Sequence, residues 1–271
     1  MKKIAVVLSL MMVFGSLMLS GCGMDAVSKP SGTAVPTPTA VIHNLNQSIT
    51  NSIMSPFFAF YFSFSDYLGR SSRIGAKNIS ALDAELSLST PEYSASTGWW
   101  TLVSSSQDGT SYASLDFRLK AYTSEETQII SIENISQMAK ALFKLRIESE
   151  TSTEATILVC GNDDRPFIIS NMIEGGTAEI DGIATYNDTI ASSNQATSIT
   201  FNHLSLGESL VPAEGSMPFS ITGNYYTPTT GTITFMGTIE RFDFSAPSEF
   251  SAQPYYFYLN EGYVTTEAPS L

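Results

Sequence analysis

The chain has 271 residues, 43% of them hydrophobic and 14% charged, and its formal net charge is −13 at pH 7. This excess of acid argues against nucleic-acid binding and against electrostatic docking on an anionic membrane surface. Two cysteines and two histidines are too few for a cysteine-based zinc site or a paired-histidine motif, so we expect neither a metal ion nor another cofactor.

Residues 1–21 have the pattern of a secretory signal peptide. A short basic stretch, MKK, precedes an apolar run from Ile4 to Leu19, which is too short for an ordinary membrane-spanning helix. Cleavage after this region removes Lys2 and Lys3 and no acid, so the formal net charge changes from −13 to −15.

The four residues LSGC, from Leu19 to Cys22, resemble the bacterial lipobox, in which a large aliphatic residue and two small residues precede a cysteine. The resemblance implies cleavage before Cys22, a diacylglycerol on its thiol and often an acyl chain on its amine. Two or three acyl chains make a stable anchor, since each buried CH₂ contributes about 0.8 kcal/mol. Gly23 stands where an Asp favours the inner membrane in enteric bacteria, which implies the outer membrane. The alternative is an ordinary signal peptide with an incidental cysteine.

Residues 22–43 are predicted to be a lipidated, flexible tether. The stretch 23–41 contains three prolines and is otherwise almost entirely small or polar. Such a composition buries too little apolar surface to offset the entropy lost on ordering. His43 ends the tether, where a polar residue is unremarkable, and residues 44–271 are predicted to be a single domain.

The segment 44–69 is predicted to be an aromatic helix. Its apolar residues recur at spacings of three and four, and Gly69 is a suitable C-cap. Pro56 would kink this helix or restart it, with Ser55 as N-cap. A strand is the alternative, because four phenylalanines alternate strictly: Phe58, Phe60, Phe62 and Phe64.

After Tyr93 the chain becomes a succession of short strand-like runs. Two of them flank Asp108-Gly109, a strong signal for a hairpin turn. In the second run polar and apolar residues alternate, which predicts a sheet with one dry face and one wet face. The residues expected on the dry face are Ala113, Leu115, Phe117, Leu119 and Ala121.

The predicted fold class is mainly β. Roughly ten to twelve strands are joined by short connections, and the lack of long crossovers predicts antiparallel pairing. The strands should form a single curved sheet, as a half-barrel or barrel, or alternatively a β-sandwich. A short helix could intervene at 133–142. The apolar helix at 44–69 is expected to pack into the concave face of the sheet, which needs a cover.

No constellation of catalytic residues stands out. His203 is expected to be a structural or surface residue, and no G-x-S-x-G motif is present. Cys160 follows the β-like run ATILV and is expected to be a small buried residue. The densest groups of loop acids do not match the calcium-binding pattern and are expected to be solvated: Asp163, Asp164, Glu179 and Asp181.

Aromatic residues are the candidates for ligand binding. Trp99 and Trp100 are neighbours on an expected strand, so their side chains must point to opposite faces of the sheet. One of them should lie in the core. Packing of the core and its rim is the main expectation for the aromatic residues, and a ligand surface is the alternative. The candidate ligand-binding residues are Phe57, Phe60, Tyr61, Phe64, Trp99 and Trp100.

These patterns predict a lipid-anchored bacterial cell-envelope lipoprotein with a non-enzymatic binding or scaffolding role. Its expected partners are the membrane, through the lipid on Cys22, and a hydrophobic ligand or an envelope protein. A first alternative is a carrier of lipid or another hydrophobic ligand in the half-barrel, an architecture like that of periplasmic lipoprotein carriers, which requires an apolar cavity between helix and sheet. A second alternative is a glycan-acting hydrolase, which requires two carboxylates about 5–10 Å apart in a cleft.

Overall fold

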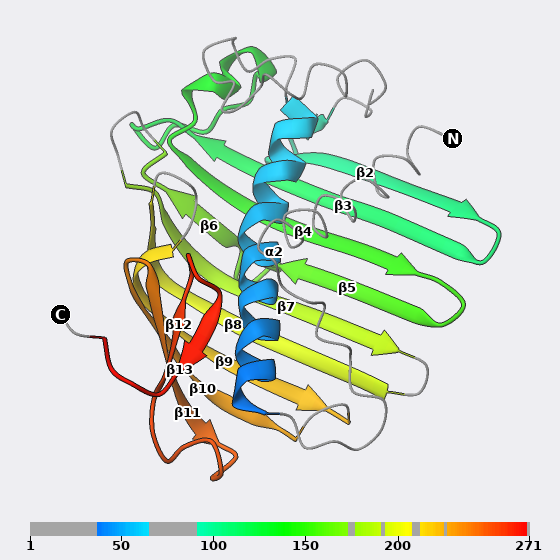
Figure 1. Ribbon diagram of the computed structural model, residues 1–271. Coiled ribbons are helices and arrows are strands. Elements are labelled where there is room, and N and C mark those ends of the chain that lie inside the picture. The colour runs from blue at the N-terminus through cyan, green and yellow to red at the C-terminus, as the bar shows by residue number, and fades with distance from the viewer. Residues whose placement is uncertain are drawn as a thin grey trace.

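Thirteen strands of the described residues form one antiparallel sheet (Figure 1). The computed structural model describes residues 37–64, 91–172, 177–190, 193–207, 212–224 and 227–269. The expected signal peptide, Cys22 and the cap at Gly69 lie outside these ranges. The strands are β1 (Glu92–Ser94), β2 (Trp99–Asp108), β3 (Ser111–Tyr122), β4 (Lys140–Glu150), β5 (Glu154–Cys160), β6 (Phe167–Ser170), β7 (Glu179–Ile190), β8 (Ser193–Leu206), β9 (Pro212–Gly223), β10 (Thr229–Met236), β11 (Ile239–Ala246), β12 (Tyr255–Tyr258) and β13 (Tyr263–Thr265).

Along the sheet the strands follow chain order from β1 to β13, except at β6. β5 and β6 share one position, because both pair with β4 on one side and β7 on the other. The chain leaves β5 at Gly161, where φ is +70° and an added Cβ would lie 2.3 Å from the backbone nitrogen of Phe167, so a side chain is excluded. The predicted single antiparallel curved sheet is confirmed, and the β-sandwich alternative is wrong because these strands form one sheet.

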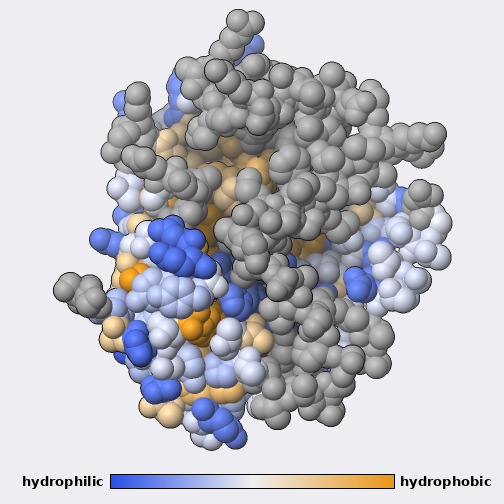
Figure 2. Space-filling model, in the orientation of Figure 1, coloured by the Kyte–Doolittle hydropathy of each residue, from blue (hydrophilic) through white to orange (hydrophobic). Residues whose placement is uncertain are grey.

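The predicted dry and wet faces are confirmed on β3. All five residues expected on its dry face are 0–9% exposed, and the residues between them are more exposed. In the orientation of Figure 2, hydrophobic residues gather in the upper middle of the visible face, and hydrophilic residues predominate towards its lower left and right. Several strands contribute large, fully buried rings to the same core: Phe117, Phe143, Phe167, Phe201 and Phe242.

A 3-10 helix, η3 (Ile132–Gln137), stands where a short helix was expected at 133–142. It ends early because β4 begins at Lys140 and pairs with β3. From there the chain alternates, with Ala141 and Phe143 buried on the dry face. The burial gained in the sheet therefore outweighs the local helix propensity of this stretch.

Helix α2 (Pro38–Phe64) begins well before the expected start at residue 44. The backbone N–H of Ala40 donates to Thr37 Oγ1 at 3.3 Å, so Thr37 acts as the N-cap. Pro38 costs no hydrogen bond in the first turn, because those N–H groups have no intrahelical partner. The last part of the predicted tether (22–43) is therefore helical, and Val41 is fully buried in the core.

The aromatic segment is a helix, as predicted, and the alternative of a strand is wrong. α2 continues through Pro56 and extends to Phe64. Residues 65–69 of the predicted helix lie outside the described residues.

α2 crosses the concave face of the sheet from one end of the strand order towards the other (Figure 1). Near its start His43 contacts Phe257 of β12, with ring centroids 5.3 Å apart, and at its end Phe64 contacts Trp100 of β2, with centroids 5.9 Å apart. The nine inter-strand steps from β2 to β12 amount to about 43 Å along the sheet. The helix rises only about 32 Å between His43 and Phe64. It is therefore a chord across a curved sheet, and the predicted packing on the concave face is confirmed.

Candidate functional site

An aromatic cluster fastens the C-terminal end of α2 to β1 and β2. The ring centroid of Phe64 lies 5.2 Å from that of Phe60 and 5.9 Å from that of Trp100, and the centroid of Tyr93 lies 5.2 Å from that of Trp100. The indole N–H of Trp100 donates to the backbone carbonyl of Ile129 at 3.1 Å, so this buried N–H group has a hydrogen-bond partner. Such ring pairs contribute about 0.5–1.5 kcal/mol beyond their buried area.

The six candidate ligand-binding residues are divided between the two faces of the sheet. Phe64 and Trp100 are 0% and 5% exposed, and Phe57 and Phe60 are partly buried against the same core. The backbone of Tyr61 lies in α2, but its side chain is outside the described set. The structure therefore brings together Phe60, Phe64 and Trp100 and separates Trp99 from them. A ligand role for any of them stays a prediction.

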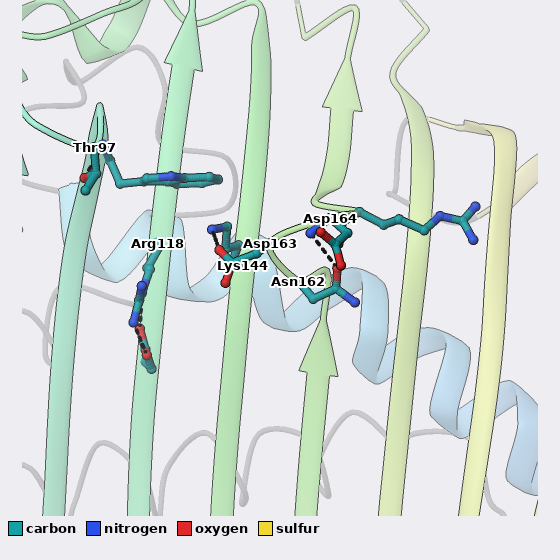
Figure 3. A network of polar contacts seen from close by, with 9 residues as sticks. Thr97, Arg118, Lys144, Asn162, Asp163 and Asp164 are labelled. Atoms are coloured by element: carbon teal, nitrogen blue, oxygen red, sulfur yellow. Dashed lines mark hydrogen bonds and ion pairs between the residues drawn. The ribbon is translucent and has the colours of Figure 1, made fainter.

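Trp99 points to the outer face, as strand alternation requires. The ammonium groups of Lys120 and Lys144 lie 4.9 and 4.2 Å from the centroid of its ring. Lys144 also pairs with Asp163 in the β5–β6 loop, and this ion pair lowers the pKa of the Asp163 carboxyl (Figure 3). Trp99 is thus held by cation–π contacts, which contribute about 0.5–1 kcal/mol at exposed sites.

Basic residues gather on the outer face around Trp99, and we call Arg118, Lys120, Lys140, Lys144 and Arg146 the basic surface. Four of the five are ion-paired; Arg118, for example, donates two hydrogen bonds to Asp116, at 3.0 and 2.9 Å. Two of the partner carboxylates are exposed and two are partly exposed, and ion pairs of this kind contribute only about 0–1 kcal/mol. The basic surface is therefore a poor source of stability, and its cations remain within reach of solvent.

In the middle of α2, Pro56 leaves a backbone carbonyl without its helical donor. Proline has no N–H, so the carbonyl of Ser52, four residues earlier, loses its hydrogen bond. The thiol of Cys160, at the end of β5, lies 3.5 Å from this oxygen and donates to it. Burial raises the pKa of the Cys160 thiol, which keeps it protonated as the donor. The expected buried Cys160 is confirmed, with an added role in joining helix to sheet.

This pairing predicts that the cost of Cys160→Ala depends on Pro56. In the wild-type background the substitution removes both packing and the hydrogen bond. In a Pro56→Ala background the new N–H satisfies Ser52, so only the packing loss remains. We expect the cost to differ by about 1 kcal/mol between the two backgrounds, measured by urea unfolding as a double-mutant cycle. Equal costs in the two backgrounds would show that the Cys160 thiol donates no stabilising hydrogen bond to the Ser52 carbonyl.

Near its N-terminal end α2 carries a polar contact to a buried acid. Glu240 on β11 is 1% exposed and shares the concave face with Phe242. Asn46 Nδ2 donates to Glu240 Oε2 at 3.0 Å. Burial raises the pKa of Glu240 to about 8, and the hydrogen bond from Asn46 offsets this only in part. The carboxyl is therefore largely neutral at pH 7, which lets it lie in an apolar interface.

His43, which was expected in the tether, lies one helical turn before Asn46. Its ring meets Phe257 edge to face, and Phe257 is the register partner of Glu240. Among the described residues, its buried Nδ1 has no hydrogen-bond partner. Burial lowers the pKa of His43, so a neutral ring is favoured.

The acid at Glu240 was missed although the sequence carries a signal for it. Glu240, Phe242 and Phe244 alternate with Arg241 and Asp243, which places the acid on the apolar face. Its partner Asn46 lies 194 residues away in sequence, and no local pattern could identify it.

His203 lies on the surface, as expected, at a bulge between β7 and β8. Its φ is +47°, and its backbone N–H donates to Asp181 Oδ1 at 2.8 Å. The bulge turns its side chain away from the core, between buried Phe201 and Leu204.

Within the described ranges, no three His, Cys, Asp or Glu side chains are grouped so as to hold a metal ion. The part of the chain that the structure describes also contains no helix that is long and apolar enough to span a membrane. Comparison with known proteins found no matching family model, curated protein or solved structure.

Proposed function

We propose that the chain is a lipid-anchored bacterial envelope lipoprotein with a non-enzymatic binding or scaffolding role. The LSGC motif ending in Cys22 supports the anchor, and the outer membrane is the favoured location. The filled interface between α2 and the sheet supports scaffolding. Side chains on both sides of this interface are 0–2% exposed, among them Leu45, Ile53, Phe201 and Phe242.

The burial of side chains at this interface favours a scaffold over a carrier. A hydrophobic carrier needs an apolar space of several hundred Å³ for its ligand. Here the concave face is occupied by α2 itself, and the helix is joined to the sheet at both ends and at its middle. On this proposal the rigid sheet displays its outer face, including the basic surface, to an envelope partner.

The hydrolase alternative has less support. Glycoside hydrolysis needs two carboxylates that act on one substrate. Glu240 is the one acid in the described residues that is buried on the concave face, and the polar contact described for it comes from the neutral Asn46.

Intact mass spectrometry of the full chain, expressed in a bacterium and extracted in detergent, tests the proposal. Under denaturing conditions we expect the mass of residues 22–271 plus two or three acyl chains. Under native conditions we expect no additional bound lipid. Cys22→Ala should lose the acyl mass, whereas the matched control Cys160→Ala should retain it.

Two outcomes would contradict the proposal in different ways. Wild-type protein that carries no acyl chains would contradict the proposed lipid anchor. Lipid that is retained in the native spectrum and lost on denaturation would favour the carrier.

A further inference from the structure

Four apolar side chains form a continuous row on the outer face of β10 to β13. Met236 is the register partner of Ile239, Ile239 of Tyr258, and Tyr258 of Tyr263. We call Met236, Ile239, Tyr258 and Tyr263 together the tyrosine row. Neighbouring strands are about 4.8 Å apart, so the row extends roughly 14 Å. Met236 is 37% exposed and Tyr263 47%, which makes them two of the four exposed large hydrophobic residues that are described.

The tyrosine row differs from the outer face of the neighbouring strands. A comparable cross-strand row over β7 to β10 consists of Thr185, Ser198, Ser220 and Thr230. The other exposed hydrophobic residues, Val103 and Ile130, belong to other parts of the chain. An apolar, aromatic strip at this end of the sheet is therefore a local feature.

The two tyrosines of the row stack on each other. Their ring centroids are 4.7 Å apart and the ring planes are inclined by only 9°. β13 is the last strand in the sheet, so the far side of the Tyr263 ring faces beyond the described strands. Desolvation, the neighbouring Tyr258 and the carboxylates of Glu261 and Glu267 raise the pKa of Tyr263. The exposed ring thus stands beside two acids.

The charged residues around the tyrosine row are mainly acidic. After Arg165 the sequence contains a single Lys or Arg, Arg241, and its guanidinium lies 2.8 Å from Asp243. Glu214 is the register partner of Met236 at the other end of the row. A partner that meets this surface should therefore offer apolar contact together with positively charged groups.

The row also lies at the end of the sheet against which the first turns of α2 pack. On the opposite face of β11 and β12, Glu240 contacts Asn46 and Phe257 contacts His43, so the first turns of α2 are directly behind it (Figure 1). Only 16 positions separate Cys22 from Pro38. Even fully extended, that stretch spans at most about 55 Å.

We infer that the tyrosine row rests on the headgroup region of a bilayer of zwitterionic lipid, an inference that depends on the proposed lipid anchor. Tyrosine rings favour this layer because they have an apolar body and a polar tip. Lipid ammonium groups match the flanking carboxylates and the open face of the Tyr263 ring. An anionic surface would be repelled by the same carboxylates.

A weak contact is sufficient for this role. A short flexible linker produces an effective concentration in the millimolar range, so a surface of low intrinsic affinity is occupied once the chain is anchored. Docking at the β10–β13 end would direct the β3–β4 end, with the basic surface, away from the membrane.

Hydroxyl-radical footprinting of the full lipidated chain tests the inference. The protein is reconstituted in vesicles of phosphatidylethanolamine and phosphatidylcholine and compared with soluble Cys22→Ala protein. We expect oxidation of Tyr263 and Met236 to be about fivefold slower on the vesicles, and oxidation of Trp99 to be unchanged. Tyr263→Ser should abolish the protection of Met236, whereas Tyr112→Ser, at the far end of the outer face, should preserve it. Vesicles rich in phosphatidylglycerol should protect less.

The outcomes separate this inference from the proposed function. Protein that carries no acyl chains and does not float with vesicles contradicts the anchor itself. Protein that floats while Tyr263 reacts as fast as in Cys22→Ala overturns the inference alone. Equal protection of Tyr263 in the soluble protein also overturns it, because another protein segment would then cover the row.

Discussion

Between pH 6.5 and pH 9, the contribution of Glu240 is expected to lower the free energy of unfolding by about 2 kcal/mol in the wild-type protein. Over the same pH range, the free energy of unfolding of the Glu240→Gln variant should stay nearly constant. Glu240 has its pKa raised from 4.5 to about 8 by burial in the interface with α2. The folded protein therefore keeps a proton that the unfolded chain has released. The contribution of Glu240 to the free energy of unfolding is full below pH 4.5 and is lost as the pH rises through about 8.

The whole shift of Glu240 corresponds to about 5 kcal/mol, of which about 2 kcal/mol falls above pH 6.5. The restriction to pH above 6.5 excludes His43, whose pKa is lowered by burial and which therefore costs stability only below 6.5. The groups that face Glu240 from the adjoining elements are uncharged: Phe235 from β10, Phe257 from β12 and Asn46 from α2. The carboxyl thus has no described cation to hold it ionised.

Urea midpoints measured over a pH series check this prediction. Gln at position 240 preserves the shape of the side chain and an acceptor for Asn46, but it does not titrate. Glu249→Gln is the matched control, because Glu249 is exposed and its substitution should reproduce the wild-type curve. A Glu240→Gln curve with the wild-type slope would show that another group causes the pH dependence.

Local patterns predicted much of the fold, because burial in a sheet imposes a period of two. The alternation from Ala113 to Ala121 located the core face of β3, and adjacency alone placed Trp99 and Trp100 on opposite faces. The start of α2 was misplaced because the composition of 23–41, three prolines among mainly small or polar residues, predicts a flexible tether. Pro38 is harmless in the first turn after the cap at Thr37.

The contacts that fasten α2 to the sheet could not be predicted from the sequence. Pro56 indicates a free carbonyl at Ser52, but its donor, Cys160, is 108 residues away. The same holds for Asn46 and Glu240. These pairs depend on the curvature of the whole sheet, which determines the strands that a straight helix can reach. Local periodicity specifies which face of a strand is buried and carries no information on that curvature.

The chord geometry predicts that a charge under α2 is far more damaging than the same charge on its solvent side. Ile49 is 2% exposed at the interface with the sheet, whereas Gln47, two residues earlier, is exposed. Ile49→Asp buries a carboxylate without a partner and removes apolar contact, so we expect a loss of more than about 4 kcal/mol. Gln47→Asp should change the free energy of unfolding by less than about 0.5 kcal/mol.

Urea unfolding measures both variants, and binding of a hydrophobic dye reports whether Ile49→Asp exposes the concave face. A loss of this size would show that the sheet depends on α2, because an open sheet cannot cover its own dry face. A chain lacking 44–69 should then be insoluble or molten. If that chain unfolded cooperatively, or if Ile49→Asp were as mild as Gln47→Asp, α2 would be an accessory segment. The concave face would then be available to a ligand, and a role as a carrier would replace the proposed role as a scaffold.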